Sequence, residues 1–392
     1  MITFENTQIA FDIKTNKELK KAYFLFKTMS KAWIVKTGKV LLQLASFLHI
    51  PINWAVKPTI YSHFVGGETL EDCENVVENL ARYNVKSILD FSVEGKESPE
   101  DIEKALQETL KSIQNAGRNP NIPFAVFKPT AFVRHKILEI VSAAKDLSSL
   151  EQKEFDAFVQ RIELLCRTAF ENHVPILIDA EDFAFQKAID EVVTKMMEKF
   201  NSEKAIVFNT LQMYRHDRLE FLEKAYKKAV EGNYYLGIKF VRGAYMERER
   251  ERAKKMNYPS PIYPDKESTD KGYNAGLKFT IDHIDRISVF NGTHNEFSSK
   301  YLADLMQEKG IDKNDSRIYF SQLYGMSDHI SFNLAKDGFN VAKYVPYGPV
   351  KFVMPYLIRR AEENTSIAGQ TSRELMLITK ELNRRKSNHH VN

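Results

Sequence analysis

The stretch YLIRRAEEN, residues 356–364, places two arginines side by side with an acid three residues later. Spacings of three, four and seven put four side chains on one face of a helix: Tyr356, Arg359, Arg360 and Glu363. Paired guanidinium groups suit the capture of a carboxylate or phosphate and repel each other without one. The alternative is an exposed helix with weak ion pairs. The rings of Tyr344 and Tyr356 favour a pocket for a small amino or keto acid.

The elements that must position this helix are short β-branched and aromatic runs, separated by segments of helical periodicity. The runs cover residues 86–92, 124–130, 175–181, 205–211, 236–243, 287–295, 317–325 and 340–348. Eight strand–helix units in roughly 300 residues indicate an α/β fold, a distorted (β/α)8 TIM barrel. A doubly wound open sheet is the alternative, but DFSVEGKES after the first run lacks the glycine-rich phosphate fingerprint.

The chain is predicted to divide into three parts. Residues 1–60 form an N-terminal helical segment packed on the barrel, and residues 61–375 form the barrel. Residues 376–392 end the last helix, with NRRKSNHHVN as a frayed polar tail. The long connection at residues 133–150 extends the link between the second and third strands.

Polar side chains follow nearly every predicted strand, where the chemistry of a (β/α)8 barrel lies. The candidates are Glu94, Lys128, Asp179, Glu181, Asn209, Gln212, Lys239, Arg242, Thr293, His294, Gln322 and Tyr344. Each one singly could be a solvated loop residue or a rim salt bridge. As a group they indicate a ligand, because inward-facing polar groups are costly to bury without partners.

Composition narrows the function classes. Lysine plus arginine number 56 against 52 acids, and the formal charge of +4 argues against nucleic acid as the main partner. Cys73 and Cys166 are too few for a disulfide framework or thiolate metal site, so both are expected in the core of a protein from a reducing compartment. No signal peptide or spanning apolar run is recognised, and a bacterial cytoplasmic protein is the simplest interpretation. The basic, aromatic N-terminal helices could touch a membrane surface peripherally.

Two other enzyme classes and a binding protein remain open from the residues alone. His294 with Asp179 and Glu181 could ligate a metal, but no H-x-H or H-E-x-x-H pattern supports a metal site. Lys128 could be a Schiff-base lysine of a barrel enzyme acting on a small carboxylic acid. A barrel kept for binding alone would have the pocket cations without a catalytic cofactor.

Several blocks along the chain resemble the proline dehydrogenase family. They are HFVGGET, KPTAF, LIDAE, NTLQMYR, KFVRGAYMERER, GTHN, QLYGM, YVPYG and YLIRRAEEN, spanning about residues 60 to 370. The resemblance implies a monofunctional enzyme that binds FAD non-covalently and oxidises L-proline to Δ1-pyrroline-5-carboxylate, the first step of proline catabolism to glutamate. Hydride would pass from proline C5 to FAD N5, and the electrons then to a quinone. The absence of a Rossmann fingerprint argues against NAD as acceptor.

The resemblance also implies residue roles. The substrate carboxylate would be held by Lys128, Arg359 and Arg360. The residues beside the substrate ring would be Asp179, Ala244, Tyr245, Tyr344 and Tyr356. The flavin and its adenosine tail would contact Asp179, Ala180, Gln212, Lys239, Val241, Arg242, Gly243, Ala244, Thr293, His294, Asn295, Gln322, Arg360 and Glu363.

The resemblance has three further implications. Glu94 falls where some family members keep an acid, so a Glu94–Arg359 gate is predicted. Lys239 and Arg242 exchange the cation types of the bifunctional members, which leaves open the side chain that approaches flavin N5. Tyr356 would crowd a 4-hydroxyl group, so proline is expected to be preferred over hydroxyproline.

Overall fold

The computed structural model describes residues 2–47, 53–92, 97–366 and 370–389. The chain has two compact units, one of residues 1–94 and 322–392 and the other of residues 95–321. Eight parallel strands follow the sheet order β1-β8-β7-β6-β5-β4-β3-β2. The predicted eight strands and the (β/α)8 fold class are confirmed.

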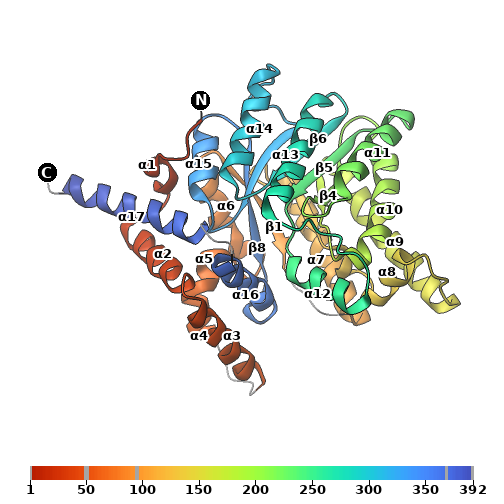
Figure 1. Cartoon of the computed structure of the whole chain (residues 1–392), viewed down its shortest axis with the longest axis horizontal. Helices are drawn as coiled ribbons and strands as arrows, with labels where there is room; N and C mark the ends of the chain where they lie inside the picture. The colour runs from red at the N-terminus through yellow and green to blue at the C-terminus, as the bar shows by residue number, and fades with distance from the viewer. Residues whose placement is uncertain (1, 48–52, 93–96, 367–369, 390–392) are drawn as a thin grey trace. The chain divides into compact units, whose positions relative to one another are not determined.

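The second unit alternates strands and helices (Figure 1). Its elements are α7 (Pro99–Arg118), β2 (Ala125–Phe127), α8 (His135–Ser142), α9 (Ser149–Glu171), β3 (Ile176–Ile178), α10 (Phe183–Phe200), β4 (Val207–Gln212), α11 (Arg218–Glu231), β5 (Leu236–Val241), α12 (Met246–Met256), α13 (Lys266–Asp282), β6 (Ile287–Gly292), α14 (Glu296–Glu308) and the start of β7 (Ile318–Leu323). Neighbouring strands from β2 to β7 pair in parallel. The predicted extension at residues 133–150 contains α8, which adds a helix to that connection.

Strands β2 and β3 are shorter than the runs that predicted them. Pairing ends at Phe127 and Ile178, with Lys128 and Asp179 as the next residues. Pro129 has no backbone N–H for a ladder and instead begins a 3-10 turn. Lys128 and Asp179 therefore lie on the loops directly after these two strands.

Aromatic rings fill the interior of the second unit. Phe124, just before β2, packs edge-on against Phe208 of β4, Phe290 of β6 and Tyr319 of β7, with ring centroids 5.6, 5.2 and 4.9 Å away. Such layers of side chains from neighbouring strands make a barrel interior a packed core. The strands are consequently held rigidly, and so are the residues that follow them.

The first unit joins the two ends of the chain. Its elements are α1 (Thr7–Phe11), α2 (Asn16–Met29), α3 (Ala32–Phe47), α4 (Asn53–Val56), a π-helical turn (Lys57–Tyr61), α5 (Ser62–Phe64), α6 (Glu74–Ala81), β1 (Val85–Phe91), α15 (Asp328–Lys336), β8 (Val341–Tyr347), α16 (Val350–Ser366) and α17 (Gln370–His389). Strands β1 and β8 pair in parallel over seven residues. Phe11, Phe26, Leu357 and Leu377 belong to one buried cluster, and α17 runs beside α2 (Figure 1).

The predicted frayed tail is wrong for residues 383–389, which continue α17. Arg385 donates to the backbone oxygens of Phe11 and Lys14, both at 2.8 Å. Glu381 is buried and accepts hydrogen bonds from Arg385 at 2.7 Å and from Thr7 at 3.0 Å. The charged composition suggested exposure, whereas these charges tie α17 to the carbonyl end of α1.

Two long helices, α2 and α3, follow α1 in the N-terminal segment. Thr15 and Glu18 make a reciprocal capping box that starts α2. A short break at residues 30–31 then separates α2 from α3. No helix in the described ranges is both long and apolar enough to span a bilayer.

Candidate active site

A cluster of two lysines around one aspartate occupies the strand ends of the second unit. Asp179 accepts hydrogen bonds from Lys128 Nζ at 3.3 Å and from Lys239 Nζ at 2.6 Å. Lys239 is buried, and the other two side chains are mostly buried. Asp179 thus holds two ammonium groups close together in a poorly hydrated place. Such a cluster attracts an anion or stabilises negative charge that develops on a bound group.

Glu181 forms the second part of this cluster. Its buried carboxylate accepts from the Thr130 hydroxyl at 2.6 Å and the Tyr245 hydroxyl at 3.3 Å. Its backbone oxygen accepts from Gln212 Nε2 at 2.8 Å. Burial raises the pKa of Glu181 to about 7, although the Thr130 hydrogen bond and the Lys128 charge lower it. Glu181 thus ties the loops after β2 and β3 to Tyr245.

Replacing Glu181 with glutamine is expected to change how stability depends on pH. A carboxyl whose pKa is raised in the fold costs stability as pH rises from its unfolded value of about 4.3 to about 7. Glutamine keeps an acceptor for Thr130 without that ionisation. The melting temperature of Glu181→Gln, relative to the parent protein, should therefore rise between about pH 5 and pH 8. Equal pH dependence of the two proteins would contradict the assignment.

Arg242 is held by partners within the second unit. Its Nε donates to Asp270 at 2.8 Å, Nη1 donates to Thr293 Oγ1 at 2.5 Å, and its guanidinium lies 4.4 Å from the centre of the Tyr273 ring. Asn295 accepts from the Ser298 backbone N–H at 2.9 Å and so caps α14. These contacts give Arg242 and Asn295 structural roles in addition to the predicted cofactor contacts.

The residues of the second unit fit a flavin. Gln212 Oε1 is buried and has no hydrogen-bond partner among the described residues, so it can accept from a flavin N–H. Gly243 has a φ of +129°, and a Cβ there would lie 2.5 Å from the Tyr214 ring. A side chain is therefore excluded at Gly243, where the backbone after β5 packs directly against the Tyr214 ring.

The arginine helix lies in the first unit. Arg360 is 7% exposed, and its guanidinium lies 5.1 Å from the centre of the Tyr356 ring, four residues earlier in α16. Arg359 is partly buried on the same helix. The predicted shared face is confirmed for Tyr356 and Arg360 by this contact. An arginine stacked on an aromatic ring keeps its fork oriented for a planar anion.

The other predicted residues of the first unit have these positions. Tyr344 is buried on β8. Gln322 is buried on β7 and accepts from the Ser331 hydroxyl at 2.7 Å. Glu94 and the side chain of Glu363 lie outside the described residues, so the gate and the Glu363 contact stay predictions.

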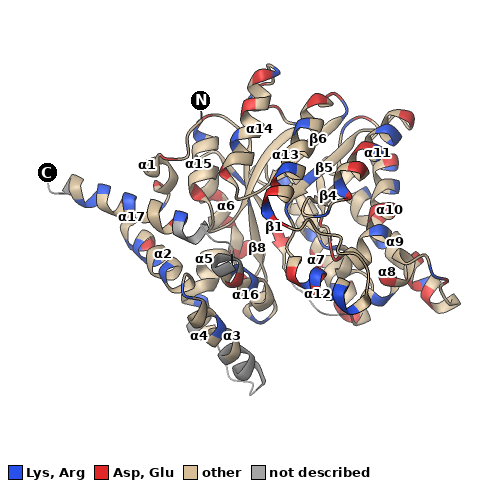
Figure 2. Ribbon diagram, in the orientation of Figure 1, with Lys and Arg blue, Asp and Glu red and all other residues tan. Residues whose placement is uncertain are grey.

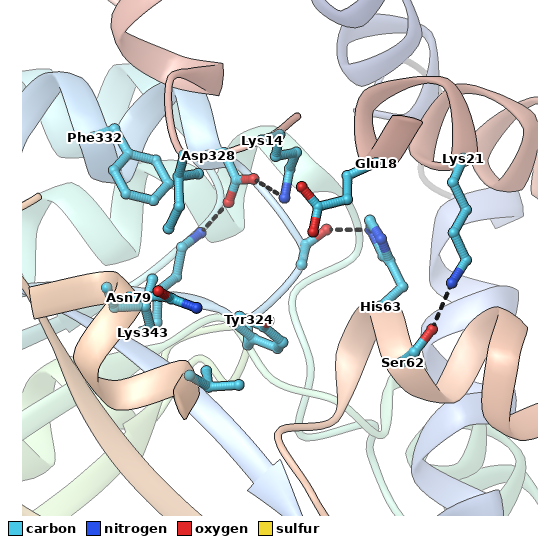
Figure 3. A pocket seen from close by; sticks show the side chains of 14 residues that line it. Lys14, Glu18, Lys21, Ser62, His63, Asn79, Tyr324, Asp328, Phe332 and Lys343 are labelled. Carbon is cyan, nitrogen blue, oxygen red and sulfur yellow. Dashed lines mark hydrogen bonds and ion pairs between the residues drawn. The ribbon is translucent and has the colours of Figure 1, made fainter. Parts of the chain in front are cut away.

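A separate polar cavity of about 280 Å³ lies within the first unit (Figure 3). Asp328 at its wall accepts from Lys14 at 3.0 Å and from the fully buried Lys343 at 2.9 Å. His63 Nε2 lies 2.9 Å from the Gly325 carbonyl oxygen, and burial lowers its pKa to about 3, so the ring is neutral. These groups form a structural network that joins the loop before α2 to α5, α15 and β8.

Comparison with known proteins shows to which family the chain belongs. The family profile described as "Proline dehydrogenase" matches residues 73–373. The chain belongs to the proline dehydrogenase family. Proline dehydrogenase 2 of Arabidopsis thaliana mitochondria is 33% identical over 373 residues, covering 84% of this chain and 78% of that protein. The carbapenem antibiotics biosynthesis protein CarD of Pectobacterium carotovorum is 36% identical over 326 residues, covering 83% of this chain and 84% of that protein.

A solved structure shows the same fold. Proline utilization A from Bdellovibrio bacteriovorus, inactivated by N-propargylglycine, superposes with a TM-score of 0.73 at 19% identity. The match covers 92% of this chain and 38% of that one, so this proline dehydrogenase family member spans well under half of the solved protein.

Several contacts of this family member escaped the sequence analysis. Thr130 was not singled out, although KPTAF was recognised as a motif, and its hydroxyl holds Glu181. Asp270, 28 residues after Arg242, carries no local signal because the pair forms only through the packing of α13 beside β5 and β6. No group of three or more His, Cys, Asp or Glu that could hold a metal is found in the described part of the chain.

Proposed function

We propose that this protein is a FAD-dependent proline dehydrogenase that oxidises L-proline to Δ1-pyrroline-5-carboxylate. Family membership supports this activity, and the chemistry of the strand-end residues agrees with it. The observation that carries the proposal is the buried Arg360 stacked on Tyr356 in α16. An arginine in that setting is oriented to bind a small carboxylate next to an apolar wall.

Holding the substrate is the task of the cationic and aromatic side chains. Arg359, Arg360 and Lys128 bind the proline carboxylate, which fixes the ring in one orientation. Each charge-assisted hydrogen bond contributes about 1.5–3 kcal/mol. The apolar side of the ring contacts Ala244, Tyr245, Tyr344 and Tyr356, while Asp179 keeps the two nearby lysines in place.

Cofactor binding is assigned to the residues that the family resemblance implies. The residues that hold FAD are Asp179, Ala180, Gln212, Lys239, Val241, Arg242, Gly243, Ala244, Thr293, His294, Asn295, Gln322, Arg360 and Glu363. FAD, when bound, supplies the N5 acceptor for the hydride from proline C5. Lys239 or Arg242 would place a positive charge beside the flavin, which would favour negative charge on its ring. The electrons leave to a quinone, with the protein on the cytoplasmic face of a bacterial membrane.

Two assays test the activity. Protein that has been denatured should release FAD, identified by chromatography. The folded protein should reduce a soluble dye with L-proline but not with D-proline, and the product should react with o-aminobenzaldehyde. Colourless protein without proline-dependent dye reduction would contradict the proposal. A Schiff-base enzyme is less favoured because Lys128 is engaged by Asp179, and borohydride with a keto acid would trap it.

Substrate choice is expected to depend on Tyr356. Its buried ring and hydroxyl would crowd a 4-hydroxyl group on the substrate. Tyr356→Ser should shift the ratio of kcat/KM for proline over 4-hydroxyproline toward hydroxyproline by about tenfold or more. Tyr356→Phe removes only the hydroxyl group, so it distinguishes the effect of the hydroxyl from the effect of the ring. An unchanged ratio in Tyr356→Ser would remove Tyr356 from the specificity assignment.

A further inference from the structure

Helix α10 begins directly after the loop that carries Asp179, and its first turn lacks the usual cap. The first backbone N–H groups of a helix need acceptors from outside the helix. Asp182 occupies the N-cap position, but its side chain makes no cap hydrogen bond. Its carboxylate instead pairs with Arg248 of α12 at 2.7 Å. The acceptor for the backbone N–H of Phe183, the first residue of α10, must therefore come from another element.

Glu249 of α12 supplies this acceptor. Its Oε1 accepts from the Phe183 backbone N–H at 2.6 Å, and the residue is 1% exposed. A carboxylate at a helix N-terminus is also favoured by the helix dipole. Burial raises the pKa of Glu249, whereas the hydrogen bond from Phe183 lowers it. Glu249 thus caps a helix that begins 66 residues earlier in the chain.

Three consecutive residues between β3 and α10 contact the start of α12. The pairs are Glu181 with Tyr245, Asp182 with Arg248, and Phe183 with Glu249. The three partners on α12 are spaced by three and four residues, so they lie on one face of that helix. These three pairs, the α12 clamp, therefore form one interface. It joins the connection after β3 to the connection after β5.

The three pairs of the α12 clamp differ in strength. The side chain of Arg248 is 60% exposed, and an exposed ion pair contributes little because water and salt screen it. The hydrogen bond from Tyr245 to Glu181 is long, at 3.3 Å. The bond to Glu249 is short, charged and shielded from water, which are the features of a strong hydrogen bond. Glu249 is therefore the principal residue of the clamp.

We propose that Glu249 is a positioning residue, which fixes the connection after β3 against the start of α12. The clamp holds Asp179 and Tyr245 in place relative to each other, because each lies within a few residues of a clamp pair on its own connection. Both side chains are assigned above to the substrate ring. The inference deepens the proposed function and rests on it for its kinetic consequence alone.

Hydrogen exchange of the full-length protein, measured without proline, tests the contact itself. Glu249→Leu removes the acceptor, so the amides at the start of α10 should exchange about ten- to a hundredfold faster. Glu249→Gln keeps an acceptor oxygen for the Phe183 N–H and should stay within about threefold of the parent protein. The amides of α14 should exchange equally in all three proteins, which would show that the fold as a whole is not destabilised.

Kinetics test the consequence for the site. In Glu249→Leu, kcat for dye reduction by L-proline should fall about ten- to a hundredfold, because a misplacement of about 1 Å can cost that much. KM should change less than kcat, since the cations assigned to the carboxylate are untouched. Glu249→Gln should recover most of kcat. Acidic and basic positions follow one another along α12 (Figure 2), and the exposed Glu251 gives the matched control Glu251→Leu, which should leave kcat unchanged.

The two measurements separate the possible failures. Unchanged exchange at the start of α10 in Glu249→Leu overturns the proposal. Faster exchange with an unchanged kcat overturns the positioning role, because Glu249 would then only cap α10. Equal losses of kcat in Glu249→Gln and Glu249→Leu contradict it as well, since only leucine removes the acceptor. A parent protein that does not reduce the dye with L-proline would reject the proposed function, while the exchange data would still decide whether the clamp exists.

Discussion

Arg360→Met is expected to raise KM for L-proline about ten- to a hundredfold, with a smaller effect on kcat. The variant removes one charge-assisted interaction with the proline carboxylate, which is worth about 1.5–3 kcal/mol, and each 1.4 kcal/mol is a factor of about ten. Arg360 should matter more than Arg359, because it is the more buried of the two and is stacked on Tyr356. Steady-state dye reduction over a range of proline concentrations measures the effect.

Two further variants control this experiment. Arg360→Lys keeps the charge but loses the planar fork, so it should recover only part of the affinity. Arg118→Met, at the exposed end of α7, makes the same chemical change on the surface and should leave KM unchanged. A KM within twofold of the parent value in Arg360→Met, with flavin content intact, would show that Arg360 does not bind the substrate.

Asp328→Asn is expected to lower the free energy of unfolding by about 3–5 kcal/mol, because it leaves a buried ammonium without its counterion. Asp328 joins Lys14 to the fully buried Lys343. Burial alone would raise the pKa of Asp328, but the charges of Lys14 and Lys343 hold it below its usual value. The midpoint of urea unfolding, followed by circular dichroism, measures the loss.

The pH dependence of the stability loss, together with a second substitution, tests whether the lost ion pairs cause it. An aspartate with a lowered pKa stabilises the fold above its unfolded value of about 3.9 and loses this effect as pH falls through the folded value. The difference between parent and Asp328→Asn should thus be constant from about pH 5 to pH 8 and shrink below about pH 4. Adding Lys343→Met should restore part of the stability. The half-exposed pair of Lys300 and Asp304 provides the control Asp304→Asn, which should change stability by about 1 kcal/mol or less.

The sequence was informative where a residue's function depends on its neighbours along the chain. The eight strands were recognisable because buried parallel strands are runs of apolar, β-branched residues. Lys128 and Asp179 could be placed at strand ends for the same reason. The contact of Arg360 with Tyr356 follows from helical spacing alone.

Contacts between distant parts of the chain could not be predicted in this way. The ion pairs from Asp328 to Lys14 and Lys343 join residues brought together by packing of the first unit, and nothing local marks them. The polar end of α17 was interpreted as a tail because Arg385 finds its acceptors on Phe11 and Lys14 at the opposite end of the sequence. Local patterns specify helices and strands, whereas partners are set by the tertiary fold.

Anaerobic titration of the purified protein with L-proline is the most direct test of the central claim, that α16 presents arginines to a carboxylate substrate oxidised by a bound flavin. The account predicts a yellow protein whose flavin absorbance bleaches with L-proline, and a titration shifted about tenfold or more to higher proline concentration in Arg360→Met. Flavin that stays oxidised at saturating L-proline, or an identical titration of both proteins, would contradict it.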